Sequence, residues 1–299
     1  MAAIITRRRW TRQPPTNTVD WSNPLFDGLV DQWVPSALTD SATGQNNASI
    51  VGNITYSDGL GGIGFTGAYQ ASNNYVNVPA AAQFGYTSTV TFEALLSVRA
   101  FQTTVFPYIS GVVSQFVGVP GPCLRFNDDA TLGNAAVPTF FVTTGGGGTE
   151  HHANGTALVT GRVYHLLGCV DGSFVRLYVD GVQVGSTAFS GAFDNTAGHI
   201  ALGSDYTDAV TSHNRCLNGS IYLARIYNTA KGPAEVAALA ADPWQRRRTR
   251  RLYFGAAAGG GSVGSAVGTS TATGVQGYIG SSTGASAATG VQGYVGRAT

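Results

Sequence analysis

The chain has 299 residues, of which 43% are hydrophobic and only 11% are charged. This hydrophobic content is enough to bury a core, which excludes an intrinsically disordered body. No apolar stretch approaches the ~18 residues that a membrane-spanning helix needs, and the N-terminal segment MAAIITRRRW has no apolar run long enough for a signal peptide. We therefore expect a protein that is made and assembled inside a cell.

Charge is distributed unevenly along the chain. Two basic clusters stand near its ends, made of Arg7, Arg8, Arg9 and Arg12, and of Arg246, Arg247, Arg248, Arg250 and Arg251. Residues 13–245 hold seven basic and sixteen acidic residues, a balance of −9. Such clusters are either solvated tails or contacts for an anionic partner. The aromatic residues Trp10, Trp244, Tyr253 and Phe254 close to them favour a packed contact.

We predict that residues 1–22 form an extended basic arm, because the segment is rich in arginine, contains Pro14-Pro15 and shows no periodic hydrophobic pattern. Residues 23–245 predict an all-β body, since Thr, Val, Tyr and Phe are frequent and helix formers are few. The first expected strands are 25–33, 64–67, 74–79, 88–98 and 137–143. A polar loop at 39–50 and a mobile tetraglycine loop at 145–148 are expected between them.

The clearest pattern is a hairpin. Apolar and polar residues alternate from Phe174 to Val179, and Asp180-Gly181 supplies the two residues of a tight turn before the return strand at 182–185. Two further strands are expected at 199–204 and 218–228. A short helix should then begin at Pro233 and end before Pro243.

Residues 246–254 predict an arginine-rich linker, and residues 255–299 a low-complexity tail. The tail repeats with a period of sixteen residues: TGVQGYIG at 273–280 recurs as TGVQGYVG at 289–296. It is either a flexible linker or an oligomeric stalk, in which Tyr278 and Tyr294 recur at fixed spacing between glycines. The cysteines Cys123, Cys169 and Cys216 have no metal-ligand spacing, so we expect reduced thiols.

Several ordered segments, STVTFEALLSV (88–98), RVYHLLGCVDGSFVRLYVDGVQVGS (162–186), HIALGS (199–204) and LNGSIYLARIYN (217–228), resemble the laminin G-like, concanavalin A-like jelly roll. The resemblance covers about residues 24–244 and implies an all-β jelly-roll β-sandwich. Domains of this family are usually binding modules or structural parts, and only sometimes enzymes. The arginine-rich ends and the repeat tail resemble proteins encoded by tailed bacteriophages.

The family resemblance also implies where ligands would bind. Its Ca²⁺ site would use a loop that survives here as Asp40, Asn46 and Asn47, but the usual acidic strand position is Tyr222, followed by Leu223. Asp205 and Asp208 could substitute, yet we expect no cofactor. Glycan-binding candidates, which could equally be ordinary turn residues, are Tyr69, Asn73, Asn74, Tyr75, Asp205, Tyr206, Asp208, His213 and Asn214.

No catalytic arrangement is visible. Glycosidases on this fold place two carboxylates across a cleft, whereas the glutamates Glu93, Glu150 and Glu235 stand far apart in the sequence. Glu93 is expected to be a surface or cross-strand charge. His151-His152 beside Glu150 could suggest a metal or base, but three adjacent residues rarely converge on one ion.

The sequence therefore predicts a non-enzymatic virion structural protein: a capsid decoration, head-fibre or tail-associated component assembled in the bacterial host cytoplasm. Its expected partners are other virion proteins and copies of itself, with a trimer favoured. The alternative is an adhesin that binds host surface glycan. We expect no membrane partner and, without a base-reading module, no nucleic-acid partner.

Overall fold

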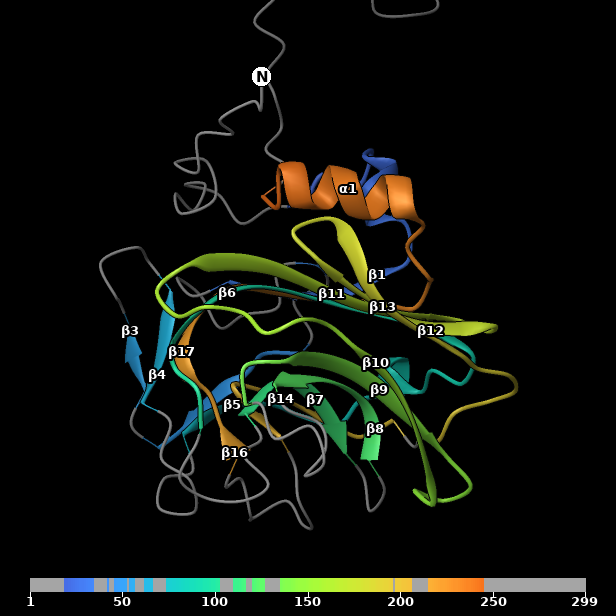
Figure 1. Ribbon diagram of the computed structural model, residues 1–299, viewed down its shortest axis with the longest axis horizontal. Helices are drawn as coiled ribbons and strands as arrows, with labels where there is room; N and C mark the ends of the chain where they lie inside the picture. The colour runs from blue at the N-terminus through green and yellow to red at the C-terminus, as the bar shows by residue number, and fades with distance from the viewer. Residues whose placement is uncertain are drawn as a thin grey trace, which may run out of the picture. The chain divides into compact units, whose positions relative to one another are not determined.

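Two antiparallel β-sheets pack face to face around one hydrophobic core, which confirms the predicted all-β jelly-roll sandwich (Figure 1). The computed structural model describes residues 19–34, 42, 46–52, 54–56, 62–66, 74–102, 110–116, 120–126, 135–195, 197–205 and 215–244. The arginine clusters, Tyr278, Tyr294 and the repeat tail lie outside the described residues, so the predictions for them and for the domain boundaries remain predictions.

Sheet 1 has the strand order β13-β12-β11-β6-β17-β4-β3, and β1 also pairs with β17. Its strands are β1 (Leu29–Trp33), β3 (Thr55–Tyr56), β4 (Ile63–Thr66), β6 (Thr89–Ala100), β11 (Val163–Asp171), β12 (Phe174–Val179), β13 (Val182–Ala188) and β17 (Asn218–Tyr227). The long strands β6, β11 and β17 form its centre. Glu93 on β6 stands opposite Arg225 on β17, and this register fixes which side chains meet on each face.

Sheet 2 has the strand order β10-β9-β8-β7-β14-β5-β2. Its strands are β2 (Ser49–Val51), β5 (Tyr75–Val78), β7 (Ser110–Phe116), β8 (Pro120–Phe126), β9 (Pro138–Thr144), β10 (Thr149–Asn154) and β14 (His199–Leu202). A separate pair joins β15 (Ser204–Asp205) to β16 (Arg215–Cys216). Two 3-10 helices, η2 (Pro24–Phe26) and η3 (Ala82–Phe84), complete the described elements together with the helix α1 (Pro233–Ala241).

Strand alternation builds the core between the sheets. On β6, Phe92, Ala94 and Leu96 point inward, where they meet core residues of β9 such as Phe140, while Glu93 and Leu95 point to the outer face. Gly168 on β11 lies directly against Phe140, and a Cβ at this position would overlap the ring. The core therefore leaves no room for a side chain there.

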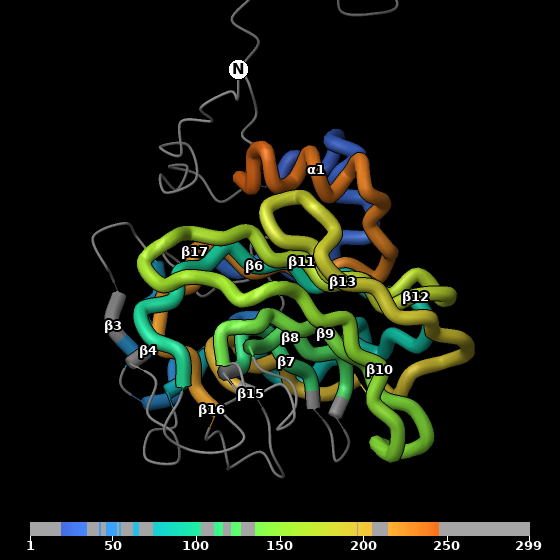
Figure 2. The backbone as a smooth tube through the Cα atoms, viewed as in Figure 1, coloured from blue at the N-terminus to red at the C-terminus, as the bar shows by residue number. Residues whose placement is uncertain are grey.

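Helix α1 covers part of the outer face of sheet 1, as Figure 2 shows. Val236 and Leu239 pack against Leu167, Cys169 and Tyr178 of the strands beneath. The helix begins where the sequence predicts, with Pro233 in its first turn and the Glu235 carboxylate accepting the Gly232 N–H at 2.8 Å. Below it, Asp180 and Gly181 have φ of 51° and 84°, as the predicted two-residue hairpin turn requires.

Both ends of the described body lie on this same outer face. Val19 packs against Phe26, Leu29 and Tyr227, and Trp244 packs against Leu95 and Leu223. We call this side of the molecule, built from residues 19–34 and 228–244 over sheet 1, the exit face.

Among the residues that the structure describes, no helix is long and apolar enough to cross a membrane.

The structure differs from the expected elements in two ways. Strands β2, β3, β7, β8, β10 and β16 were not predicted, and β2 begins within the expected polar loop at 39–50. Residues 145–148 form the tight turn of the β9–β10 hairpin rather than a mobile loop. Gly145, Gly146 and Gly147 all have positive φ, so the glycines serve backbone geometry that other residues rarely adopt. Asp194 holds the turn by accepting the Gly147 N–H at 2.7 Å.

Replacing Gly168 with Ala should lower the free energy of unfolding by about 1–3 kcal/mol, because the added methyl overpacks the core against Phe140. The measurement is urea unfolding followed by tryptophan fluorescence. Gly148→Ala is the matched control, since a Cβ there makes only an ordinary van der Waals contact. Equal stability of the two variants would contradict the packing argument.

Candidate ligand-binding face

The outer face of sheet 2 is the side of the sandwich away from α1, and it carries a cluster of polar and aromatic side chains. On β8, β9 and β10, Leu124, Phe140 and Ala153 belong to the core. Their neighbours in the sequence therefore point to the outer face. We call the four that contact one another, Arg125, Phe141, Glu150 and His152, the Phe141 cluster.

Phe141 lies between a cation and an imidazole in this cluster. The Arg125 guanidinium stands 4.0 Å from the centre of the Phe141 ring, and the His152 ring stacks on it with centres 5.4 Å apart. Glu150 Oε2 is 3.0 Å from His152 Nε2 and 3.9 Å from Arg125 Nη2. The strand order makes this possible, because β9 lies between β8 and β10 and brings all three strands' outward residues together.

The cluster has a buried base and an accessible edge. The side chain of Arg125 is only 5% exposed, whereas those of Glu150 and His152 are 40% and 23% exposed. The Phe141 ring itself is buried, with 1% exposed. The groups of the cluster that a polar ligand can reach are therefore the Glu150 carboxylate and the His152 imidazole, which can hydrogen-bond. His151 points the other way, with its ring edge against Phe189 of the core. Of the three adjacent residues 150–152, Glu150 and His152 thus meet and His151 does not join them.

Three of the predicted glycan-binding residues are described, Asn74, Tyr75 and Asp205, and they lie near the opposite edge of sheet 2, where β14 and β5 pair. Asn74 and Tyr75 stand at the start of β5, and the Asn74 backbone N–H bonds the Cys216 thiol beside β15. Burial raises the pKa of Cys216 and of Tyr75. The structure thus brings Asn74, Tyr75 and the Asp205 strand together. Yet Asn74 and Tyr75 are only 3% and 6% exposed and support this end of the sheet from within.

The other glycan-binding candidates, Tyr69, Asn73, Tyr206, Asp208, His213 and Asn214, lie outside the described residues, and their role stays a prediction. Sequence reasoning did not find Arg125 or Phe141. The only available signal was alternation in PGPCLRF and PTFFVTT, which places Arg125 and Phe141 opposite the core residues.

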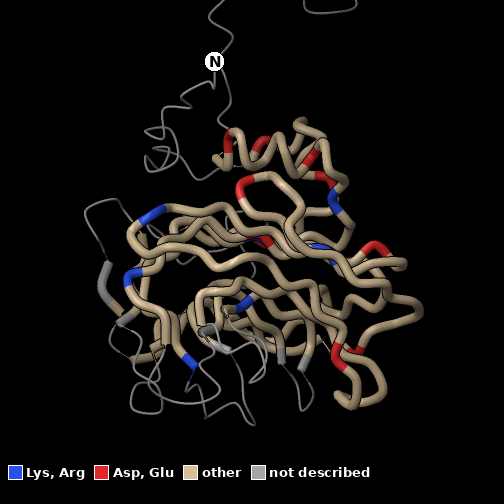
Figure 3. Tube along the Cα trace, viewed as in Figure 1, with Lys and Arg blue, Asp and Glu red and all other residues tan. Residues whose placement is uncertain are grey.

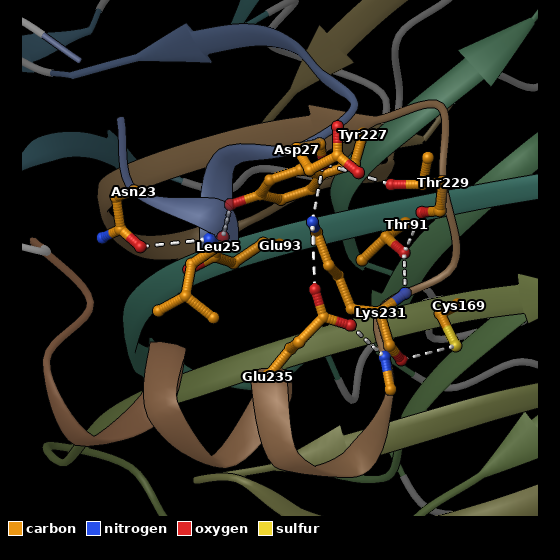
Figure 4. A network of polar contacts seen from close by, with 11 residues as sticks. Asn23, Leu25, Asp27, Thr91, Glu93, Cys169, Tyr227, Thr229, Lys231 and Glu235 are labelled. Carbon is orange, nitrogen blue, oxygen red and sulfur yellow. Dashed lines mark hydrogen bonds and ion pairs between the residues drawn. The ribbon is translucent and has the colours of Figure 1, made fainter. Parts of the chain in front are cut away.

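Glu93 is a fully buried charge on the outer face of sheet 1, the other side of the sandwich (Figure 4). It is a cross-strand charge, as one of the two expectations had it, but it has no surface exposure. It accepts hydrogen bonds from Tyr227 Oη at 2.8 Å and Arg225 Nη1 at 3.1 Å, and its Oε1 lies 2.9 Å from His165 Nε2. Gln32 on β1 accepts from Arg225 Nε. Glu93 therefore ties four strands together.

The pKa of Glu93 follows from these contacts. Burial by itself would raise the pKa, but the Arg225 charge and the hydrogen bonds from His165 and Tyr227 lower it to about 2. Burial also raises the pKa of Tyr227 well above its ordinary value, so the phenol stays a donor. At neutral pH Glu93 is therefore an ionised, buried counterion of Arg225.

A second network joins α1 to the N-terminal segment, as Figure 4 also shows. Lys231 Nζ donates to the backbone carbonyl of Asp27 at 2.6 Å and lies 3.5 Å from Glu235. The Lys231 N–H donates to Thr91 Oγ1 at 3.1 Å on β6. Glu235 thus caps the helix and pairs with Lys231. The three glutamates of the chain therefore lie in three separate parts of the structure.

Of the residues that the family resemblance implies for Ca²⁺, Asp40 and Asp208 lie outside the described residues, so the expectation of no cofactor stays a prediction. The described members Asn46 and Tyr222 make other hydrogen bonds. Asn46 is buried and donates its side-chain N–H to both carboxylate oxygens of Asp31, at 3.0 and 2.8 Å. Tyr222 is buried with its hydroxyl 3.1 Å from Ser97 Oγ, and Leu223 packs beneath Trp244. Ca²⁺ needs six or more oxygen ligands, and this strand offers no carboxylate.

Residues 70–237 match the family model described as concanavalin A-like lectin/glucanases superfamily. The match covers more than half of the sequence. The chain belongs to the concanavalin A-like lectin/glucanase superfamily. No curated protein matches the sequence. The superfamily assignment agrees with the two sheets described above and confirms the predicted resemblance for the domain.

Solved structures share the superfamily fold at low sequence identity. The binding domain of botulinum neurotoxin DC in complex with SialylT has a TM-score of 0.57 and 9% identity, over 74% of this chain and 53% of that one. The binding domain of Paraclostridial Mosquitocidal Protein 1 has a TM-score of 0.54 and 14% identity, over 72% of this chain and 52% of that one. Trypanosoma rangeli sialidase in complex with sialic acid has a TM-score of 0.51 and 16% identity, over 72% of this chain and 33% of that one. The chain thus spans about half of the two toxin domains and a third of the sialidase.

Glu93→Gln should lower the free energy of unfolding by about 3–5 kcal/mol, because it leaves the Arg225 guanidinium buried without its counterion. Denaturant unfolding monitored by circular dichroism gives the value. Glu235→Gln, which weakens a partly exposed helix cap, should cost only about 1 kcal/mol. A loss no larger for Glu93→Gln than for Glu235→Gln would argue against the network.

The contribution of Glu93 should also depend on pH. Its folded pKa of about 2 lies below the ordinary value of 4.5. Its ionised form therefore stabilises the fold fully above pH 4.5, and this stabilisation is lost as pH falls from 4.5 towards 2. The free energy of unfolding of the wild-type protein should fall more steeply over this range than that of Glu93→Gln. Parallel curves would contradict the assignment.

Proposed function

We propose that this chain is a non-enzymatic structural protein of a bacteriophage particle, a capsid decoration, head-fibre or tail-associated component, that displays a lectin-like jelly roll and is anchored by its terminal segments. The observation that carries the proposal is the position of the two ends of the described body. Val19 and Trp244 both pack on the exit face, while the outer face of sheet 2 lies on the opposite side of the sandwich.

This arrangement suits a displayed module, because anchoring and recognition use different sides of the domain. The anchoring segments in this proposal are the two arginine clusters and the repeat tail with Tyr278 and Tyr294. A chain whose ends leave on one side can be held there without obstructing the other side. Other virion proteins would be the partners of the anchoring segments.

The placement of the carboxylates supports a non-enzymatic role. A retaining or inverting glycosidase needs two carboxylates about 5–10 Å apart across the scissile bond. Here Glu93 is sealed inside sheet 1, Glu235 caps α1, and Glu150 stands on the opposite face of the sandwich. These three glutamates cannot form such a pair.

A second candidate, favoured by the Phe141 cluster, is a glycan-binding adhesin or receptor-binding protein. Glu150 and His152 offer partly exposed hydrogen-bonding groups on the face of the sandwich away from the exit face. The solved neighbours include proteins in complex with sialic acid or SialylT. The two candidates can coexist in one protein.

Deleting residues 255–299 should abolish oligomerisation or incorporation into particles, because the repeat tail supplies the anchoring contacts. Light scattering of the purified full chain and of the deletion variant gives their masses, with a trimer favoured for the full chain. Unchanged assembly of the deletion variant would defeat the anchoring role of the tail.

For the second candidate, His152→Ala and Glu150→Ala should each weaken binding of the full chain to a glycan array hit by about tenfold, since each removes one hydrogen-bonding group. Phe174→Ala is the control, because Phe174 is an exposed aromatic side chain on the outer face of sheet 1. If no array glycan binds the wild-type chain at millimolar concentration, the adhesin candidate is rejected.

A further inference from the structure

The exit face carries an exposed aromatic side chain next to the point where the chain enters the body. Trp21 is 57% exposed, in a turn closed by the Asn23 N–H to the Asp20 carbonyl at 2.9 Å. Ser22 Oγ donates to the Asp20 carboxylate at 2.6 Å and stiffens the same turn. The following helix η2 packs beside α1, with Leu25 against the cluster of Val236 and Leu239. Trp21 is therefore held outward on a fixed support.

The same face is acidic. Residues 19–34 and 228–244, which build it, contain five acidic residues and one basic residue, Lys231. Lys231 is buried and paired with Glu235, and Asp31 is buried beneath Asn46. Asp20, Asp27, Glu235 and Asp242 are left at least partly exposed. Figure 3 shows the acidic positions gathered around α1.

The sequence attaches arginine clusters to both ends of this acidic face. Arg12 precedes Val19 by seven residues, and Arg246 follows Trp244 by two. The segments that leave the body are thus basic where the body itself is acidic. A single chain carries both halves of a complementary charge pair, and charge complementarity of this kind selects partners and fixes their register.

We propose that the exit face binds a second copy of this chain, with the arginine-rich segments of one copy on the carboxylates of its neighbour and Trp21 in the contact. The inference rests on the proposed function for the idea that copies assemble. A head-to-tail contact of this kind forms a ring where its rotation closes and an open filament where it does not.

The residue types favour a protein partner of this kind over a polyanion. Arginine and tryptophan are enriched in protein interfaces, where lysine is depleted. The two clusters contain only arginine, and the one lysine of the chain is buried. A nucleic acid would also have to approach the carboxylates of the exit face, which repel phosphate. Nucleic acid is therefore an outcome of the test that would overturn the proposal.

The test measures the mass of the full chain by light scattering at about 0.1 M and about 1 M NaCl, between which the Debye length falls from about 10 Å to about 3 Å. Self-association should weaken at high salt. Joint replacement of Arg7, Arg8, Arg9 and Arg12 by Gln should weaken it by about tenfold at low salt, and Asp27→Lys and Trp21→Ser should each weaken it as well.

Two controls match these variants. Val159→Ser removes an apolar side chain that is 64% exposed in the β10–β11 loop, outside the exit face, and Arg297→Gln removes the one arginine of the tail. Both should leave association unchanged. Near-ultraviolet circular dichroism checks that each variant is folded. A wild-type chain that is monomeric at low salt, or that associates only with an added oligonucleotide, would overturn the proposal.

The deletion of residues 255–299 separates this inference from the proposed function. If the deletion variant still associates at low salt, and loses association when the four arginines are replaced, the exit-face contact holds and the tail is not the assembly device. If the deletion alone abolishes association and the arginine and Trp21 variants of the full chain behave as wild type, the inference fails while anchoring by the tail stands.

Discussion

The ion pair between Glu93 and Arg225 is the constraint around which the outer face of sheet 1 is organised. Both groups are fully buried, so each would be strongly destabilising without the other. Glu93 also takes the Tyr227 hydroxyl and lies against His165, and Arg225 reaches Gln32 on β1. A shift of β1 or β17 in register would expose Glu93 or Arg225 to water or leave one of them buried without its partner. The network therefore selects one register for the central strands.

The covering of that network explains why the two faces of the sandwich differ. Two segments cover this side of sheet 1 and keep water from Glu93 and Arg225. The N-terminal segment places the Phe26 ring with its centre 5.0 Å from the Arg225 guanidinium. The C-terminal segment adds α1. Lys231 fastens the two segments together through the Asp27 carbonyl. Both terminal segments of the described body, residues 19–34 and 228–244, thus pack on sheet 1. The outer face of sheet 2 keeps its Phe141 cluster outside these segments.

Local patterns predicted much of the fold and little of the site. The Asp180-Gly181 turn, the strands beside it and the helix after Pro233 have signals within a few residues, and all are present. Strand β8 was missed because its two prolines and its glycine are typical of loops. The burial of Glu93 was missed because alternation correctly places it outward, while its cover comes from segments more than fifty residues away in sequence. The same non-local packing buries Asn74 and Tyr75, which composition alone places in exposed turns.

In the glycan-binding proposal, Arg125 of the Phe141 cluster would support recognition without touching the ligand. Arg125 is as buried as a core residue, yet its guanidinium rests on Phe141 and lies near Glu150. Its guanidinium stands 3.9 Å from the Glu150 carboxylate and helps to hold it at the exposed edge beside His152. A ligand would then find an oriented acceptor and an imidazole on a rigid three-strand support rather than on a loop. Such preorganisation reduces the entropy that binding must overcome, and it makes β9, with Phe141 at its centre, the element on which any recognition by this face depends.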